Sequence, residues 1–319
     1  MIRVFSFTPL ILAWALMLPQ AVSAQPETAE AKRWLGQMAQ SNRELSYQGL
    51  FTYEHGIALE TFKLTRWVDQ GAQYERLEHL SGPEREVLRQ GLAADCQSAG
   101  DQVRHGRLTL SDGQVADLGE YYYLDMAGQE RVAGRSTRQV QIIPRDTYRY
   151  GYLLDVDEDT GLLLRSLLID EQRRVLERFQ FVDIQLAPAQ AEIRLEPRAQ
   201  LFRQANAHPS PCNPTALTQP DGWHLDWLPP GFVFSGQQTV QDDTEMLMYT
   251  DGLSTFSVFL APADGDRAIE GRAQRGATNA YMGQVAAGER RFRVTVVGEV
   301  PVQTAEQVAN GIVAEGAQP

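Results

Sequence analysis

Apolar residues follow two different spacings along this chain. Between residues 27 and 45 they recur about every three to four positions, which places them on one face of a helix. The residues that form this face are Ala31, Trp34, Leu35, Met38 and Leu45. From residue 47 onward, apolar and polar positions alternate through 47–54, 57–68 and 72–80, which are rich in Tyr, Phe, Thr, Leu and Val. This second pattern predicts long antiparallel strands in a meander.

The segment 74–91, YERLEHLSGPEREVLRQG, combines four glutamates with three arginines. Its alternation predicts two strands joined at Ser81-Gly82-Pro83. Charges on one face of such a hairpin would form opposite-sign pairs across the strands. Nothing in the segment places a glutamate in an apolar setting that would raise its pKa. We therefore interpret it as a structural or binding hairpin and not as an acid/base site.

The later sequence contains further strand patterns and one break. Strands are predicted within 121–126, 138–145, 148–170 and 173–186, and then within 232–240, 245–262 and 290–301. Six of the sixteen prolines lie between residues 187 and 221, where neither a helix nor a central strand can continue. We predict a first domain over 25–196, a linker over 197–221 and a second domain over 222–319. A final helix is expected from Ala305, with Thr304 and Gln307 as a capping box.

The first 24 residues are typical of a secretory signal peptide. Arg3 precedes an apolar run from Leu10 to Leu18, and small residues lead up to a predicted cleavage between Ala24 and Gln25. The run is short for a membrane span, which needs about 20 residues. The alternative is an uncleaved membrane anchor.

Charge and cysteine content narrow the choice of partners. The net charge of −12 disfavours nucleic acid, which needs clustered Lys and Arg. Five arginines between 131 and 149 form either a solvated sheet face or a patch for an anionic head group or acidic peptide. In an oxidising compartment, Cys96 and Cys212 are candidates for a disulfide; the alternative is two unpaired thiols.

Motifs for chemistry are missing from the sequence. It has no G-x-S-x-G, P-loop, G-x-G-x-x-G, H-E-x-x-H or C-x-x-C pattern, and its five histidines are scattered singly. We predict no catalytic residues, no cofactor site and no metal site. A hydrolase whose catalytic residues are dispersed is the weaker alternative, because triads assemble from distant positions.

Aromatic residues offer a binding function instead. A curved sheet around a helix could hold an acyl chain, and burying a dozen methylenes could contribute roughly 10 kcal/mol before ordering costs. The candidates for such a lipid cavity are Phe51, Tyr53, Phe62 and Trp67. The alternative is that these side chains pack against the first helix.

Several stretches together resemble one family. They are SYQGLFTYEHG (46–56), ERLEHLSGPEREVLRQG (75–91), YRYGYLLDVDEDTGLLLRSLLID (148–170), WLPPGF (227–232), YTDGLSTFSVFLAP (249–262) and VTVVGEVP (294–301). In this order they resemble the RseB/MucB family, regulators of the sigma-E envelope-stress response. The resemblance implies an α+β, β-rich fold: a LolA/LolB-like curved, incomplete β-barrel with a helical plug, then a smaller α+β domain.

The resemblance also implies a function. Its expected partner is the periplasmic segment of an RseA/MucA-type anti-sigma factor, which the protein would protect from site-1 proteolysis. Lipid or lipopolysaccharide would be the releasing signal, and the location would be the periplasm. The alternative is a periplasmic lipid or lipoprotein carrier, and the sequence is compatible with a homo-oligomer.

Overall fold

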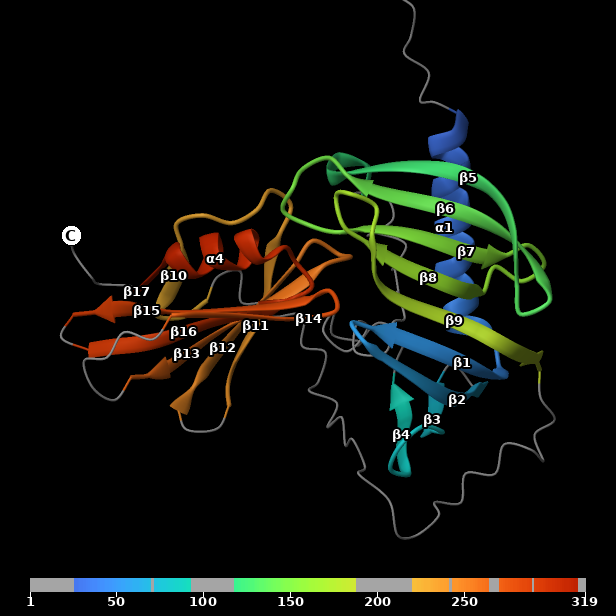
Figure 1. Ribbon diagram of the computed structural model, residues 1–319, viewed down its shortest axis with the longest axis horizontal. Helices are drawn as coiled ribbons and strands as arrows, with labels where there is room; N and C mark the ends of the chain where they lie inside the picture. Colours follow the sequence, from blue (N-terminus) through green and yellow to red (C-terminus); the bar gives the residue numbers. More distant parts are fainter. Residues whose placement is uncertain are drawn as a thin grey trace, which may run out of the picture.

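The structure is a computed structural model that describes residues 26–69, 72–92, 118–187, 220–240, 243–263, 270–288 and 290–314. Its elements form two large antiparallel sheets, each with a helix on one face, and a small two-stranded sheet (Figure 1). This arrangement confirms the predicted α+β, β-rich fold. The predicted signal cleavage at Ala24–Gln25 and the candidate pair Cys96 and Cys212 lie outside the described residues.

The first sheet has nine strands in the order β4-β3-β2-β1-β9-β8-β7-β6-β5. Strands β1 and β9 meet at its centre, so the two ends of this part of the chain are held together. The sheet is curved and open at β4 and β5, as expected of an incomplete barrel (Figure 1). Its strands are β1 (Tyr47–His55), β2 (Ala58–Asp69), β3 (Ala72–His79), β4 (Arg85–Leu92), β5 (Tyr122–Val132), β6 (Arg135–Pro144), β7 (Gly151–Asp157), β8 (Leu163–Ile169) and β9 (Val175–Leu186).

Helix α1 (Pro26–Glu44) packs against β5 and β6 of this sheet and confirms the predicted first helix. Its apolar face is completely or almost completely buried, at Ala31, Trp34, Leu35, Met38 and Ala39. The end of the helix is tied to the sheet by hydrogen bonds: the Ser41 hydroxyl donates to the carbonyl of Thr160, and the Arg66 guanidinium donates to the carbonyl of Asn42.

The second sheet has six strands in the order β11-β12-β13-β16-β15-β14, and β10 pairs with β17 beside it. Helix α4 (Val302–Asn310) packs on β15 and β16. The strands are β10 (Trp223–Leu225), β11 (Val233–Thr239), β12 (Glu245–Thr250), β13 (Thr255–Pro262), β14 (Gly271–Arg275), β15 (Thr278–Ala287), β16 (Arg290–Gly298) and β17 (Ile312–Ala314). No helix in the described part of the chain is long and apolar enough to cross a membrane.

The predicted capping box at the last helix is wrong. The helix begins earlier, with Pro301 at the N-cap position, and no side chain caps it. Thr304 lies inside the helix, and its hydroxyl donates to the carbonyl of Tyr148 in the first sheet's loop, at 3.1 Å. A contact between distant segments therefore replaced the local hydrogen bond that sequence spacing suggested.

The charged hairpin 74–91 forms as predicted, and an opposite-sign pair crosses it: Arg76 Nε of β3 lies 2.7 Å from Glu86 Oε1 of β4. Direct opposition differs at one position, where Glu78 faces Glu86. Glu78 has its cation on β2, with Lys63 Nζ 3.9 Å from its Oε1. These ion pairs fit a structural hairpin.

Candidate functional site at the junction of the two sheets

The two sheets meet through turns of the second sheet that pack against the first. Leu253, in the turn between β12 and β13, and Ala277, in the turn between β14 and β15, are buried in the same apolar cluster as α1 and β5–β8. Burying apolar surface favours contact but does not fix its geometry, because the hydrophobic effect is non-directional. Polar groups around the turns at Leu253 and Ala277 fix the geometry of the contact.

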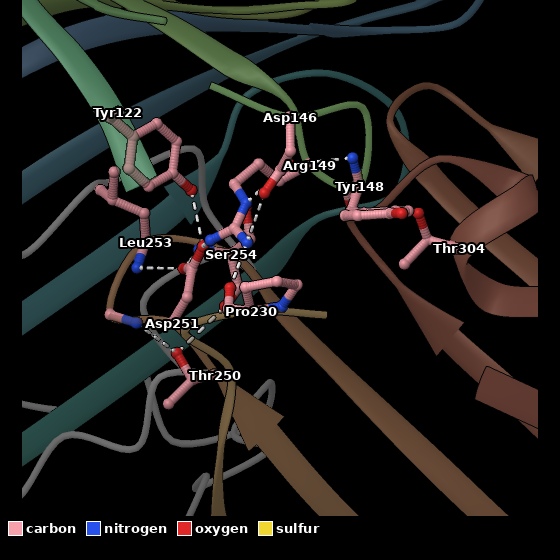
Figure 2. A network of polar contacts seen from close by, with 11 residues as sticks. Tyr122, Asp146, Tyr148, Arg149, Pro230, Thr250, Asp251, Leu253, Ser254 and Thr304 are labelled. Atoms are coloured by element: carbon pink, nitrogen blue, oxygen red, sulfur yellow. Dashed lines mark hydrogen bonds and ion pairs between the residues drawn. The ribbon is translucent and has the colours of Figure 1, made fainter. Parts of the chain in front are cut away.

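Arg149 is the centre of the first polar group, shown in Figure 2. Its side chain is buried, although it precedes β7 in a loop of the first sheet. It lies 2.5 Å from Asp251 of the second sheet and 2.9 Å from Asp146 of its own loop, and it also donates to the carbonyl of Pro230. A buried guanidinium needs such compensation, since an unpaired buried charge is very costly.

Aromatic rings complete the surroundings of this guanidinium. Its carbon lies 5.0 Å from the ring centroid of Phe232, 5.2 Å from that of Tyr121 and 5.5 Å from that of Tyr122. Cation–π attraction at this range is stronger where water is excluded. Burial alone would lower the pKa of Arg149, but Tyr122, Asp251 and Asp146 more than offset it, so the pKa lies above its ordinary value. The residue is a permanent cation.

Asp251 is positioned by its own turn and by Tyr122. The backbone N–H groups of Leu253 and Ser254 donate to its Oδ1 at 2.9 and 2.7 Å. Its Oδ2 accepts from the Tyr122 hydroxyl at 2.7 Å as well as from Arg149 (Figure 2). Burial and the neighbouring Asp251 carboxylate raise the pKa of Tyr122 well above its ordinary value, so it stays a donor.

Glu177 on β9 is the centre of a second polar group. Its Oε1 accepts from the backbone N–H of Ala277 at 2.9 Å, and its Oε2 accepts from the hydroxyl of Tyr53 on β1. Gly276, with φ of +61°, permits this approach, because an added Cβ would lie 2.7 Å from Glu177 Oε1. One carboxylate thus joins the centre of the first sheet to a turn of the second.

Glu299 follows β16 and is buried beside this group. Burial and the negative charge of Glu177 raise its pKa well above the usual 4.5. Burial likewise raises the pKa of Tyr53 and of Tyr152, with further contributions from Glu177 and Glu299 respectively. Here carboxyl groups lie close together, whereas the Arg149 group has one cation between two carboxylates.

Asn279 connects the two polar groups. Its Nδ2 donates to the hydroxyl of Tyr150 in the first sheet and to the carbonyl of Val300 in the second, each at 2.9 Å. It is almost completely buried. The junction therefore has directional bonds along its length, and it can hold the two sheets in one arrangement.

The four lipid-cavity candidates lie at three different places. Phe51 and Phe62 are buried on the face of the sheet that α1 covers, with ring centroids 5.0 Å apart, and they belong to an aromatic core with Phe179 and Phe181. Tyr53 lies at the junction. Trp67 is stacked on Tyr74 at 5.0 Å, and its position along β2 places it on the opposite face from Phe62.

Two hollows lie next to α1. One, of about 20 Å³, is lined by Met38, Asn42, Tyr47, Leu162, Leu163, Phe179 and Phe181. That is room for about one water molecule. The other, of about 420 Å³, lies at the start of α1 and β5 and is lined by Thr28, Lys32, Gly119, Glu120, Tyr122, Tyr123, Leu124, Asp125 and Arg145.

The arginines of 131–149 do not form one patch. Arg135 pairs with Asp157 at 2.7 Å, and Arg138 pairs with Glu30 at 3.2 Å. Arg145 lies over the ring of Tyr123 at 3.9 Å. Within the described ranges, no group of three or more His, Cys, Asp or Glu side chains could hold a metal ion.

Comparison with known proteins gives two family matches. Residues 30–199 match the MucB/RseB N-terminal domain, and residues 217–313 match the MucB/RseB C-terminal domain. The chain belongs to the MucB/RseB family. The resemblance inferred from the sequence is thereby confirmed.

Relatives of this MucB/RseB chain are similar over nearly their whole length. The sigma factor AlgU regulatory protein MucB of Pseudomonas aeruginosa is 36% identical, over 95% of this chain and 97% of that protein. The sigma-E factor regulatory protein RseB of Haemophilus influenzae is 26% identical, over 94% and 96%. These relatives are sigma-factor regulatory proteins by name.

Solved structures also match. The chain in the Pseudomonas aeruginosa MucA/MucB complex has a TM-score of 0.73 and 32% identity, covering 90% of this chain and 100% of that one. A crystal structure of MucB has a TM-score of 0.62 and 32% identity, covering 90% of this chain and 98% of that one.

The sequence did not reveal the junction residues as functional, although they lie within the family-like stretches. Arg149 lies in YRYGYLLD, Pro230 in WLPPGF, Asp251 in YTDGLSTF and Glu299 in VTVVGEVP. These family-like stretches meet in space at the junction. Four weak motifs therefore share one structural role in this MucB/RseB chain.

Proposed function

We propose that this protein binds the periplasmic segment of an RseA/MucA-type anti-sigma factor and thereby restrains the sigma-E response. The observation that carries the proposal is the match over both domains to MucB in a complex with MucA, at a TM-score of 0.73. A crystal structure of MucB also matches, at 0.62, with 90% of this chain covered.

The junction gives this binding a physical basis. A partner that contacts both sheets loses less free energy to ordering when the sheets are already held in place. The buried Arg149–Asp251 pair and the Glu177–Ala277 bond supply this preorganisation. A bound segment covered by both sheets would be inaccessible to the site-1 protease, and this steric protection is our proposed mechanism.

We further propose that lipid or lipopolysaccharide releases the partner. The hollow beneath α1 holds about one water, so an acyl chain could reach Phe51 and Phe62 only if α1 moved. Side chains of α1 share one apolar cluster with Leu253 and Ala277 of the second sheet. Moving the helix would therefore disturb the junction. Lipid can release the partner only if it binds better to a state that binds the partner poorly. Displacement of α1 would produce such a state.

The proposed location is the periplasm, after cleavage between Ala24 and Gln25. The signal-like residues 1–24 support it, as does the solved complex of MucB with MucA(peri). Sequencing the N-terminus of the protein recovered from the periplasm tests the site. A mature chain that begins at Gln25 is expected, and recovery of the intact chain in the membrane fraction would contradict it.

The alternative function is a lipid or lipoprotein carrier. The C-terminal match over residues 217–313 favours regulation, because a carrier would need only the lipid-holding sheet. Affinity purification from periplasm separates the two. Recovery of the anti-sigma factor supports regulation, and recovery of lipoproteins without it supports transport.

A protection assay tests the main proposal. The purified anti-sigma periplasmic segment is treated with the site-1 protease, with and without this protein, and lipopolysaccharide is then added. We expect protection that lipopolysaccharide reverses. A second protease substrate that this protein does not bind controls for direct effects on the protease. Equal cleavage with and without this protein would overturn the proposal.

A further inference from the structure

The two faces of the six-stranded sheet differ sharply. One face carries the C-terminal core, and Leu247, Phe256, Val258, Leu260, Val294 and Val296 are buried there beneath α4. Figure 1 shows α4 lying across this face. No helix or strand among the described elements of the first sheet packs broadly against β11, β12 or β13.

The opposite face carries three methionines among small polar residues such as Ser257 and Thr295. Strand pairing places Met246 opposite Phe259, and Met248 opposite Ser257. The same pairing places Met282 opposite Thr295 on the neighbouring strands. Each of these methionines, and Phe259, is only half-buried. We call this surface the methionine face; its apolar members are Met246, Met248, Phe259, Ala280, Met282 and Val297.

The charged residues that the described strands place on the methionine face are all arginines. Alternation along the strands puts Arg275, Arg291 and Arg293 on this side, and all three are exposed. The described strands β11–β16 place no Asp or Glu on it, because their one acidic residue, Glu245, shares the α4 side with Leu247. Such a face is unusual in a chain whose net charge is −12.

We infer that the methionine face is the docking surface for an acidic, apolar segment of the anti-sigma factor's periplasmic region. This inference rests on the proposed function and identifies where on the protein it takes place. Methionine side chains are flexible and polarisable, so they adapt to the apolar side of a docked segment. Arginines at the rim attract acidic residues, raise the association rate and fix the register.

The position of the face fits this role. Its strands end at the turns that carry Leu253 and Ala277 into the junction. A segment lying along the strands would therefore reach the point where the two sheets meet. Loss of the junction would remove one end of its binding surface, which links docking to the arrangement of the sheets.

Charge reversal on the two sides of one strand tests the inference. Arg293→Glu changes the methionine face, and Arg290→Glu is the matched control, because Arg290 is also exposed but faces the other side of β16. Affinity for the purified anti-sigma periplasmic segment is measured by calorimetry with the full chain. We expect Arg293→Glu to weaken binding at least tenfold and to flatten its salt dependence, and Arg290→Glu to change it less than twofold.

A second variant addresses the apolar part. Met248→Thr is smaller and polar but tolerated on a half-exposed strand, and we expect it to weaken binding threefold or more, with unchanged circular dichroism and thermal midpoint. If the wild-type chain binds the segment and all three variants bind equally well, the inference is overturned while the proposed function stands. If the wild-type chain does not bind, the proposed function itself fails.

Other occupants of the face give distinct results. Flotation with phosphatidylglycerol vesicles tests an anionic lipid surface, and light scattering tests a second copy of this chain. Loss of vesicle binding, or of self-association, in Arg293→Glu with unchanged affinity for the anti-sigma segment would overturn the inference. Loss of affinity for the anti-sigma segment, with vesicle binding and self-association unchanged, supports the inference.

Discussion

The two polar groups at the junction differ in how their buried charges are balanced. Around Arg149, one buried cation is held between Asp146 and Asp251, so charge is compensated. Around Glu177, a second buried carboxyl group, Glu299, lies close by, so charge is in excess. The first arrangement is insensitive to pH because the guanidinium is always charged. In the second, the raised pKa of Glu299 makes the contribution of the group to stability depend on pH.

This difference suggests a division of roles. The Arg149 group acts as a fixed attachment between the sheets, and the Glu177–Glu299 group is the part of the junction that conditions can loosen. The predictions below test this contrast, from the largest expected effect to the smallest.

Removing the buried cation should have the largest effect. Arg149→Met leaves Asp146 and Asp251 without their partner, and breaking a buried pair in this way costs about 3–5 kcal/mol. The free energy of unfolding in urea should fall by this amount. The control is Arg174→Met, which removes an arginine that is 75% exposed and paired with Asp170. A surface pair of that kind contributes about 0–1 kcal/mol. Equal losses in the two variants would contradict the account.

Removing the Glu177 carboxylate should have a smaller net effect, because it also removes the repulsion between Glu177 and Glu299. Glu177→Leu leaves the Tyr53 hydroxyl and the Ala277 N–H without their acceptor, and each buried unsatisfied group costs about 1–3 kcal/mol. Hydrogen exchange at the Ala277 amide should accelerate, while exchange within β12 should stay unchanged. Unchanged protection of the Ala277 amide against hydrogen exchange would show that its hydrogen bond to Glu177 does not stabilise the junction.

The pH dependence of the junction should come from Glu299. Its pKa is raised in the folded protein, mainly by burial and then by Glu177, so the folded state binds this proton more tightly than the unfolded state does. Its contribution to stability is therefore complete below the ordinary value of 4.5 and declines as the pH rises toward the raised pKa. Tyr53, Tyr152 and Glu177 lie close to Glu299, and the raised pKa values of the two tyrosines keep them neutral.

Glu299→Gln should remove this dependence. The variant should be more stable than the wild type at pH 8 and close to it at pH 4.5, as followed by thermal unfolding at both pH values. Glu130→Gln, at an exposed position on β5, is the control and should leave the pH profile unchanged. If the stability of Glu299→Gln keeps the wild-type slope against pH, the pH dependence comes from other groups.

The smallest effect should come from Thr304. Its hydroxyl donates to the carbonyl of Tyr148 across the junction at 3.1 Å. Thr304→Val keeps the shape and removes one hydrogen bond, which contributes about 0.5–1.5 kcal/mol. Urea unfolding measures the loss. If helix capping were the role of this residue, circular dichroism would also show lost helix, which we do not expect.

Sequence patterns predicted most of the first sheet because its strands alternate clearly. In β1 and β2, Phe51 and Phe62 face the core, whereas Glu54 and Lys63 lie on the opposite face. Strands β14 and β15 were missed: GRAQR and TNAYMGQVAA are rich in Gly, Ala and Gln, which have little preference for strands. Their place in the sheet comes from strand pairing: β15 pairs with β16, which follows it directly along the chain, and β14 pairs with β15 at the edge of the sheet.

The junction could not be predicted because its bonds join distant residues. Arg149 and Asp251 are 102 positions apart, and Glu177 and Ala277 are 100 apart. Nothing in the spacing of one sequence shows that they meet. For the same reason, the aromatic residues suggested a single cavity, whereas Phe62 and Trp67 lie on opposite faces of β2. Local alternation identified strands but not which faces would be covered.

The central claim is that the junction holds the sheets in the arrangement that binds the anti-sigma segment. The most direct test measures the affinity of the segment for the wild type, Arg149→Met and Arg174→Met by calorimetry, with solution X-ray scattering on the same samples. The account predicts that Arg149→Met expands in scattering and binds at least tenfold more weakly, while Arg174→Met matches the wild type in both. Expansion of Arg149→Met with unchanged affinity would contradict it.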